Sequence, residues 1–236
     1  VKVAGIAALG RILLGAFPSR INDWAPLLAV LAILSIVVGT VGAIGQRDVK
    51  RMLAYSGVAH AGFMITGLVA GIDGMPSVWF YLATYVVQLV GAFTVVSIVS
   101  GVRSGRSEFD EYQGLWSRSP KLAIAMAVFM LGMAGIPFFA GFVGKLAVFG
   151  SAISAGYLWL AIAGLVAAVA GLFFYLRIVV LMFFEAPVPA DAPGTATAAP
   201  GLGGGAGFVV ILTATLTVLL GIVPWPLLNL VRYALL

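Results

Sequence analysis

The stretch AGIPFFAGFVGKLAVF, from Ala134 to Phe149, places a proline, three glycines and a lysine inside a long apolar region. That region runs from Pro120 to about Ser154, and as one straight helix its roughly 34 residues would measure about 50 Å. The hydrocarbon core of a bilayer is only about 30 Å thick, so such a helix must tilt strongly or be interrupted. Proline removes a backbone donor and clashes with the preceding turn. We therefore predict an interrupted helix, with Gly135, Pro137 and Gly141 forming the break.

The composition indicates a protein that lies largely within a membrane. Apolar side chains make up 62% of the 236 residues and charged side chains only 9%, whereas a soluble globular domain is about a quarter charged. The apolar runs are long and unbroken, unlike the alternating strands of about ten residues in a transmembrane barrel. The predicted fold class is an all-α polytopic membrane protein, a helical bundle with one broken helix.

The residue counts also limit the chemistry that this chain can perform. Cysteine is absent, which excludes thiolate ligation of iron–sulfur clusters or zinc, and disulfides. His60 is the only histidine and there are eight acidic residues, so little is available for a metal site, and we expect no cofactor or metal. The net charge of +5 comes from scattered basic residues, which suit the cytoplasmic surface of a membrane better than a nucleic acid.

Seven segments are long and apolar enough to predict transmembrane helices, because about 20 apolar residues span a bilayer. They are Val1–Phe17, Pro26–Gly45, Val49–Gly71, Val78–Gly101, Pro120 to about Ser154, Tyr157–Phe184, and Phe208 to about Leu230. Residues 185–206 are rich in Pro, Ala and Gly, a composition typical of a flexible linker. The predicted organisation is therefore a bundle over 1–184, a linker over 185–206 and a C-terminal transmembrane helix over 207–236.

The polar connections predict how the chain crosses the membrane. Residues 46–51 (QRDVKR) carry three basic side chains, and the connection at 102–119 (VRSGRSEFDEYQGLWSRS) mixes arginines with acids, so we expect it to be solvated. The connections GIDGMPS and SAISAG carry no positive charge. By the positive-inside rule, the basic connections are cytoplasmic. The chain begins at Val1 without a signal-peptide pattern, and we expect it to be the C-terminal part of a longer protein.

Two lysines fall within apolar segments. A charge at membrane depth costs about 2.5–3.5 kcal/mol on insertion scales and indicates a functional site by default. Lys145 follows the predicted break, where free backbone groups require a partner or water, so a hydrated pocket is expected there. The alternative is a lysine that snorkels to the interface. Lys2 precedes 15 apolar residues and is expected inside the bilayer, unless the helix begins there and Lys2 is interfacial.

Several other polar groups lie in apolar helices. His60 is ten residues into its helix, with Ser56 one turn earlier on the same face; His60 can relay protons or hydrogen-bond across a helix interface, and both readings stay open. Tyr85 and Gln88, three residues apart, can line a water path or bind a neighbouring helix. All eight acids lie in connections or at segment ends. A buried lysine favours its neutral amine, so lysines joined by water, and His60, are the candidates for a proton relay.

Three stretches together resemble the antiporter-like membrane subunits of bacterial respiratory complex I, the proton-translocating NADH:quinone oxidoreductase, and are most similar to its subunit N type. They are RDVKRMLAYSGVAHAGFMITGL (47–68), FYLATYVVQLVGAF (80–93) and EYQGLWSRSPKLAIAMAVFMLGMAGIPFFAGFVGKLAVF (111–149). The resemblance implies helices eight to fourteen of the family, with eight to thirteen in 1–184. Lys2 matches a central relay lysine, and Lys145 matches the lysine of the broken twelfth helix near the proton's exit. Gln88 and Phe138-Phe139 depart from the usual pattern.

The resemblance implies a subunit that moves protons outward through a hydrated relay of buried lysines, driven by redox chemistry in other subunits. NADH, flavin, iron–sulfur clusters and quinone would be bound by those other subunits. The expected partners are other membrane-arm subunits and the lipid bilayer, and the expected location is the bacterial cytoplasmic membrane. Two alternatives remain: a subunit of an Mrp-type multisubunit cation/proton antiporter, and a purely structural membrane spacer.

Overall fold

The computed structural model describes residues 2–102, 107–187, 201 and 203–233, and within these ranges the chain is helical and contains no strand. Three short 3-10 helices are η1 (Pro18–Arg20), η2 (Gly71–Gly74) and η3 (Phe109–Tyr112). The α-helices are α1 (Lys2–Ala16), α2 (Ile21–Ile44), α3 (Val49–Leu68), α4 (Met75–Val102), α5 (Leu115–Arg118), α6 (Pro120–Ala134), α7 (Ala140–Ser154), α8 (Leu158–Phe184), α9 (Gly204–Ile222) and α10 (Trp225–Tyr233).

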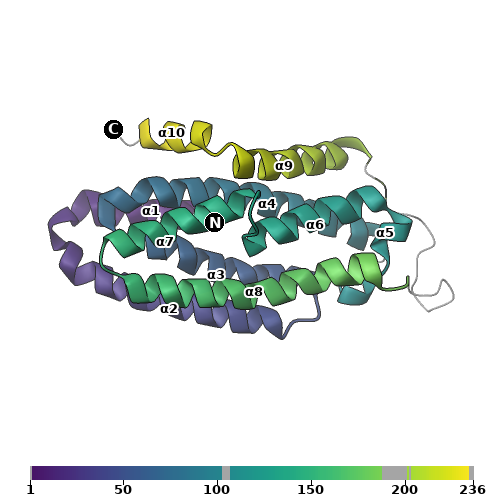
Figure 1. Ribbon diagram of the computed structural model, residues 1–236, viewed down its shortest axis with the longest axis horizontal. Coiled ribbons are helices and arrows are strands. Elements are labelled where there is room, and N and C mark those ends of the chain that lie inside the picture. The colour runs from purple at the N-terminus through teal and green to yellow at the C-terminus, as the bar shows by residue number, and fades with distance from the viewer. Residues whose placement is uncertain (1, 103–106, 188–200, 202, 234–236) are drawn as a thin grey trace.

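The long helices lie side by side along one axis (Figure 1). α2, α3 and α8 form one side of the bundle, and α9 and α10 lie along the opposite side. Small residues bring α2 and α3 together: a Cβ added to Gly39 would lie 2.3 Å from the Ala59 nitrogen, and one added to Gly62 would lie 2.7 Å from the Ala32 oxygen. Membrane helices pack by such close backbone contacts because apolar burial drives association less strongly in lipid than in water.

Four helical spans in the described residues are long and apolar enough to cross a membrane. They are Pro18–Ile44, Gly71–Gly101, Leu158–Phe184 and Gly204–Ile222. Three shorter apolar helices are Val3–Ala16, Pro120–Ala134 and Ala140–Ser154. α3 has 20 residues but carries polar groups, among them Ser56 and His60, along its length. The helices therefore include full crossings and shorter pieces that must combine with others to reach both membrane surfaces.

Two predicted helix boundaries are wrong, both because of proline. The helix predicted to begin at Pro26 begins at Ile21 and contains Pro26. Proline has no N–H, so the Asn22 carbonyl lacks its usual donor. Asn22 is exposed and near the helix start, so the proline is tolerated there. The single helix predicted over Phe208–Leu230 is two helices, since α9 ends at Ile222 and α10 begins at Trp225. The residue before a proline avoids the α conformation, and Val223, before Pro224, has φ −124° and ψ 73°.

The predicted linker 185–206 is described only in part. Its final residues, from Gly204, belong to the first turn of α9. Residues 188–200 and 202 lie outside the described ranges, so the prediction of flexibility there stays a prediction.

The connection between α4 and α6 is more buried than its polar sequence suggests. Its aromatic and aliphatic side chains pack into the bundle, namely Phe109, Tyr112 and Leu115. Two backbone hydrogen bonds join it to the start of α3: the Val49 N–H donates to the Ser107 oxygen at 2.8 Å, and the Phe109 N–H donates to the Arg47 oxygen at 3.0 Å. The expectation of a fully solvated connection is therefore wrong for 107–119, since its apolar residues are drawn into the core.

Candidate functional site

The chain leaves helical geometry between α6 and α7, near the middle of the bundle (Figure 1). Gly135 ends α6 in the left-handed conformation with φ 85°, which is the usual role of glycine after a helix. The Gly135 N–H donates to the Gly132 oxygen at 3.0 Å, and the Ile136 N–H donates to the Leu131 oxygen at 3.1 Å. Pro137 follows and cannot donate a backbone hydrogen bond. Gly135 and Pro137 therefore lie where the helix stops.

Gly141 has a different place from the one predicted. It is the second residue of α7, so it is not part of the interruption. A Cβ at this position would lie 2.0 Å from the Gly132 oxygen. Gly141 therefore serves close packing of α7 against the end of α6, and this packing offsets the cost of a glycine within a helix.

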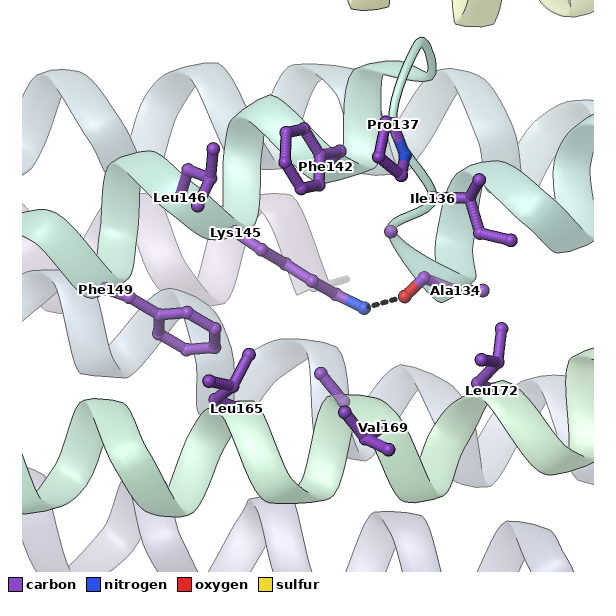
Figure 2. Close-up of a pocket in the computed structure, with 12 residues that line it drawn as sticks. Ala134, Ile136, Pro137, Phe142, Lys145, Leu146, Phe149, Leu165, Val169 and Leu172 are labelled. Atoms are coloured by element: carbon purple, nitrogen blue, oxygen red, sulfur yellow. Dashed lines mark hydrogen bonds between the residues drawn. The ribbon is translucent and has the colours of Figure 1, made fainter.

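Lys145 lies in α7 and is 7% exposed. Its Nζ donates to the Ala134 oxygen at 2.7 Å (Figure 2) and to the Met133 oxygen at 3.0 Å. The last carbonyls of a helix lack intrahelical donors and form the negative end of the helix dipole. The end of α6 thus supplies the acceptors for the Lys145 amino group. Nζ also lies 5.3 Å from the centroid of the Phe63 ring.

A cavity of about 270 Å³ lies beside Lys145, between the break, α7 and α8. Figure 2 shows the lysine side chain extended across it towards Ala134, with Leu165 and Val169 of α8 opposite. These two α8 side chains are 57% and 64% exposed. The cavity therefore lies at the outer flank of the bundle, and Lys145 supplies its only charged side chain among the described residues.

His60 lies at the centre of a group of tyrosines and is 2% exposed. Its Nδ1 is 2.8 Å from the Tyr81 hydroxyl and its Nε2 is 2.9 Å from the Tyr175 hydroxyl. The Tyr85 ring stacks on the imidazole with centroids 4.5 Å apart. A neutral imidazole donates through one nitrogen and accepts through the other, so one of the two hydroxyls accepts a hydrogen bond and the other donates one.

A second cavity, of about 10 Å³, connects the two ionisable groups. Both Lys145 and His60 line it, together with Ser56 and Thr40. That volume is about the minimum that one water molecule occupies. The Ser56 hydroxyl, fully buried, donates to the Leu53 oxygen at 3.0 Å. The space between the histidine and the lysine therefore suits a single bridging water with polar partners on several sides.

The predicted site residues are only partly gathered in one place. Lys145, His60 and Ser56 share the small cavity, and Tyr85 stacks on His60. Gln88 lies elsewhere: it is 1% exposed, and a Cβ on Gly132 would approach its Nε2 to 3.1 Å. Lys2 is the first residue of α1, and its side chain lies outside the described part of the structure. No group of three or more metal-ligating residues is present in the described ranges.

Sequence reasoning gave no role to Tyr81 and missed Tyr175. Tyr175 is 115 residues from His60 along the chain, and no local pattern connects the two. Tyr81 reaches His60 because α7 carries Gly144 beside it: a Cβ at Gly144 would lie 2.4 Å from the Tyr81 ring. The sequence shows only that Gly144 immediately precedes Lys145; that Gly144 faces Tyr81 is known only from the folded chain.

Residues 1–171 match the family model described as NADH:quinone oxidoreductase/Mrp antiporter, TM. The chain belongs to this family. A member described as NADH-quinone oxidoreductase subunit N, from Parafrankia sp. (strain EAN1pec), is 43% identical over 240 residues, which cover 99% of this chain and 44% of that relative. The chain thus spans less than half the length of that relative. Family membership, together with the apolar helices, makes this chain a multi-pass integral membrane protein.

Chains of two solved structures superpose on this chain. The first is respiratory complex I from Thermus thermophilus with bound Aureothin: one of its chains is 32% identical and superposes with a TM-score of 0.72, over 86% of this chain and 45% of that chain. The second is the Mrp complex from Dietzia sp. DQ12-45-1b, at 23% identity and a TM-score of 0.88, over 99% of this chain and 50% of that chain. At that identity, the second likeness concerns the fold alone.

Proposed function

We propose that this chain is part of a subunit N of bacterial NADH:quinone oxidoreductase and moves protons outward across the cytoplasmic membrane. The observation that carries the proposal is the buried ammonium of Lys145, held by the end of α6 and joined to His60 by a cavity of water size. Relatives named as this subunit support it at 39% to 44% identity. The chain holds no redox group in this proposal; NADH oxidation and quinone reduction take place in partner subunits of the membrane complex.

The membrane topology of the proposal counts α6 and α7 as one interrupted crossing. Each has 15 residues, about 22 Å of helix, which is too short to span about 30 Å of hydrocarbon. Together with the five connecting residues they are long enough. α1 also has only 15 residues, and it is counted as a crossing on the strength of the family resemblance. With α2, α3, α4, α8 and α9, this gives the seven crossings of the fragment, and the positive-inside rule indicates that Arg47 and Arg51 are on the cytoplasmic side.

Lys145 is the group that takes up and releases the proton. When its amine is neutral, Nζ accepts a proton from a water in the small cavity. The resulting ammonium is stabilised by the Ala134 and Met133 carbonyls, because hydrogen bonds in which the donor is charged are roughly twice as strong as neutral ones. A change in the charge of neighbouring groups then favours release into the larger cavity, on the outer side of the break.

His60 is proposed to deliver protons to that water through the Tyr175 hydroxyl, which lies beside Nε2 and also lines the small cavity. When this hydroxyl takes the proton of Nε2, it releases its own proton to the water. A proton accepted at one ring nitrogen and released from the other crosses the imidazole and leaves the opposite tautomer. Tyr81 and Tyr175 hold the two nitrogens, so the ring stays in place while its proton changes position. Rotation of the two hydroxyl groups restores the starting arrangement. Lys2 is retained as the preceding relay lysine on the strength of the family resemblance.

An Mrp-type cation/proton antiporter subunit remains the second candidate. The superposition on an Mrp complex covers 99% of this chain, so the fold accommodates either function. The two proposals differ in their partners: purification of the full-length protein from its own membranes should recover quinone reductase subunits in the first case, and small antiporter subunits in the second.

The test uses the complete assembly in sealed vesicles and compares protons moved per NADH oxidised. Lys145→Arg keeps a cation that proteins do not deprotonate, so we expect fewer protons per NADH although the helix break keeps its charged partner. Lys121→Arg, at an exposed position at the start of α6, is the matched control and should leave the ratio unchanged. An unchanged ratio in Lys145→Arg would overturn the role of Lys145.

A further inference from the structure

Two adjoining cavities lie on the flank of α8, away from the Lys145 site. One, of about 410 Å³, is lined by Arg47, Glu108, Phe109, Asp110 and Arg177. The other, of about 500 Å³, shares Phe109, Asp110 and Arg177 and continues along α8 to Glu185 over apolar side chains, among them Phe173 and Val180. Both volumes fall within the range of small-molecule sites. Together they form a groove, which we call the α8 groove. Its charged end holds the two arginines with Glu108 and Asp110, and apolar side chains of α8 line the rest as far as Glu185.

The connection that forms one wall of the α8 groove is held in place by backbone hydrogen bonds. Besides the two bonds to the start of α3, the Gly114 N–H donates to the Leu181 oxygen of α8 at 3.1 Å. Phe109 is 5% exposed, and the Arg177 guanidinium lies 4.6 Å from its ring centroid. The charged end is therefore built on fixed backbone, and Arg177 is supported by an aromatic ring rather than by a carboxylate.

The charges around the groove are of both signs. The two arginines are accompanied by three carboxylates, those of Glu108, Asp110 and Glu185. Within the described residues, none of these carboxylates makes an ion pair within 4.0 Å with either arginine. The charges surround the cavities without neutralising one another at contact distance, which leaves both signs available to a ligand.

The length of α8 and the orientation proposed above put the α8 groove near the cytoplasmic end of the hydrocarbon. The 27 residues of α8 measure about 40 Å, roughly 10 Å more than the hydrocarbon thickness. Arg177 lies seven residues before the end of α8 at Phe184, about 10 Å from it. Phe173 is 60% and Val180 47% exposed on the same flank. Phe173 thus lies on the bilayer side of Arg177, Val180 lies between Arg177 and the end of α8, and Glu185 lies beyond that end.

We infer that the α8 groove binds one phospholipid whose headgroup carries a phosphate and a primary ammonium, that is, an ethanolamine phospholipid. The phosphate lies between Arg177 and Arg47, because guanidinium groups bind phosphate through paired N–H donors. The ammonium, with three N–H donors, faces Asp110 and Glu185, and an acyl chain follows the apolar wall of α8. A purely anionic headgroup is disfavoured because the carboxylates outnumber the arginines.

The test measures lipid retained by the purified full-length assembly, using native mass spectrometry in detergent with added phosphatidylethanolamine or phosphatidylglycerol of identical chains. Arg177→Gln should lower retention of phosphatidylethanolamine by at least about tenfold, since it removes hydrogen bonds to a charged group. Arg51→Gln removes an exposed arginine at the same end of the bundle that lines neither cavity, and should retain lipid like the unaltered protein.

Asp110→Asn tests recognition of the ammonium separately from recognition of the phosphate. It should weaken binding of phosphatidylethanolamine more than binding of phosphatidylglycerol, so that the difference in affinity between the two lipids becomes smaller. Arg177→Lys keeps the positive charge and replaces Arg177→Gln as the test if that variant fails to assemble. It should still bind phosphatidylethanolamine in preference to phosphatidylglycerol, with lower affinity than the unaltered protein. Equal retention in Arg177→Gln and Arg51→Gln, or equal binding of the two lipids by the unaltered protein, would overturn the inference.

Discussion

Replacing Gly135 by alanine tests whether the helix break and Lys145 act together. Gly135 has φ 85°, and a Cβ there would lie 2.9 Å from Lys145 Cδ and 3.1 Å from its Nζ. The backbone strain costs about 1–2 kcal/mol. The lysine must also move away, which puts at risk its bonds to Ala134 and Met133, each worth about 1.5–3 kcal/mol for a charged donor.

Gly156 provides the matched control for the strain alone. It has φ 86° and no neighbouring atom within 4 Å of an added Cβ. Gly156→Ala should therefore lower thermal stability by the same backbone cost, about 1–2 kcal/mol, while leaving Lys145 in place. The difference between the two variants isolates the contact with the lysine.

The assay measures protons moved per NADH, together with the thermal midpoint of the purified assembly. If Gly135→Ala loses one of the two hydrogen bonds to the ammonium, the charged amine is destabilised by about 1.5–3 kcal/mol, and every 1.36 kcal/mol lowers its population about tenfold at a given pH. Gly135→Ala should then move fewer protons per NADH, and Gly156→Ala should not. Equal ratios in the two variants would refute the idea that the break positions the lysine.

Three further predictions concern the hydrogen-bond partners of His60, the packing of α2 against α3, and the N-terminal cap of α3. Tyr81→Phe and Tyr175→Phe each remove a hydroxyl that is hydrogen-bonded to His60. Each should lower the free energy of unfolding by about 1–3 kcal/mol and reduce the protons moved per NADH. Tyr55→Phe, at a partly exposed tyrosine, is the control, and the same proton ratio in all three variants would contradict the relay. Gly39→Ala should cost about 1–3 kcal/mol by overpacking α2 against α3, whereas Gly5→Ala, with nothing within 4 Å, should not lower the thermal midpoint. Asp48→Ala removes the side-chain acceptor of the Arg51 N–H and should lower the free energy of unfolding by about 1 kcal/mol. Asp48→Asn keeps an acceptor and should lose little of that stability. Equal thermal midpoints of Asp48→Ala and Asp48→Asn would show that the cap contributes nothing.

The end of α6 shortly before Pro137 was predictable because it follows from one-dimensional lengths. An apolar run of known rise per residue is compared with a bilayer of known thickness, and the glycine and proline within the run indicate where it stops. The end of α9 at Ile222 was readable by the same local chemistry, since Pro224 and Pro226 are close together, but the continuous hydrophobicity of the segment outweighed this signal in our prediction.

The tyrosine arrangement around His60 was not predictable, because it depends on which helices become neighbours. Tyr175 meets His60 only after α3 and α8 pack together. Gly141 shows a related difficulty: a glycine near a break can end a helix or permit close packing, and only the position of Gly132 in the folded chain distinguishes the two. The identity of a polar residue is local information, whereas its partner is set by tertiary packing.

In the proposed relay, water joins His60 to Lys145 in the small cavity between α3, α7 and α8. The most direct test of this relay is an experimental structure of the whole assembly at a resolution that shows ordered water. We expect a water in the cavity of about 10 Å³ within hydrogen-bonding distance of Lys145 Nζ, and further water in the cavity of about 270 Å³. A dry small cavity, with a lipid chain filling the larger one, would contradict the relay.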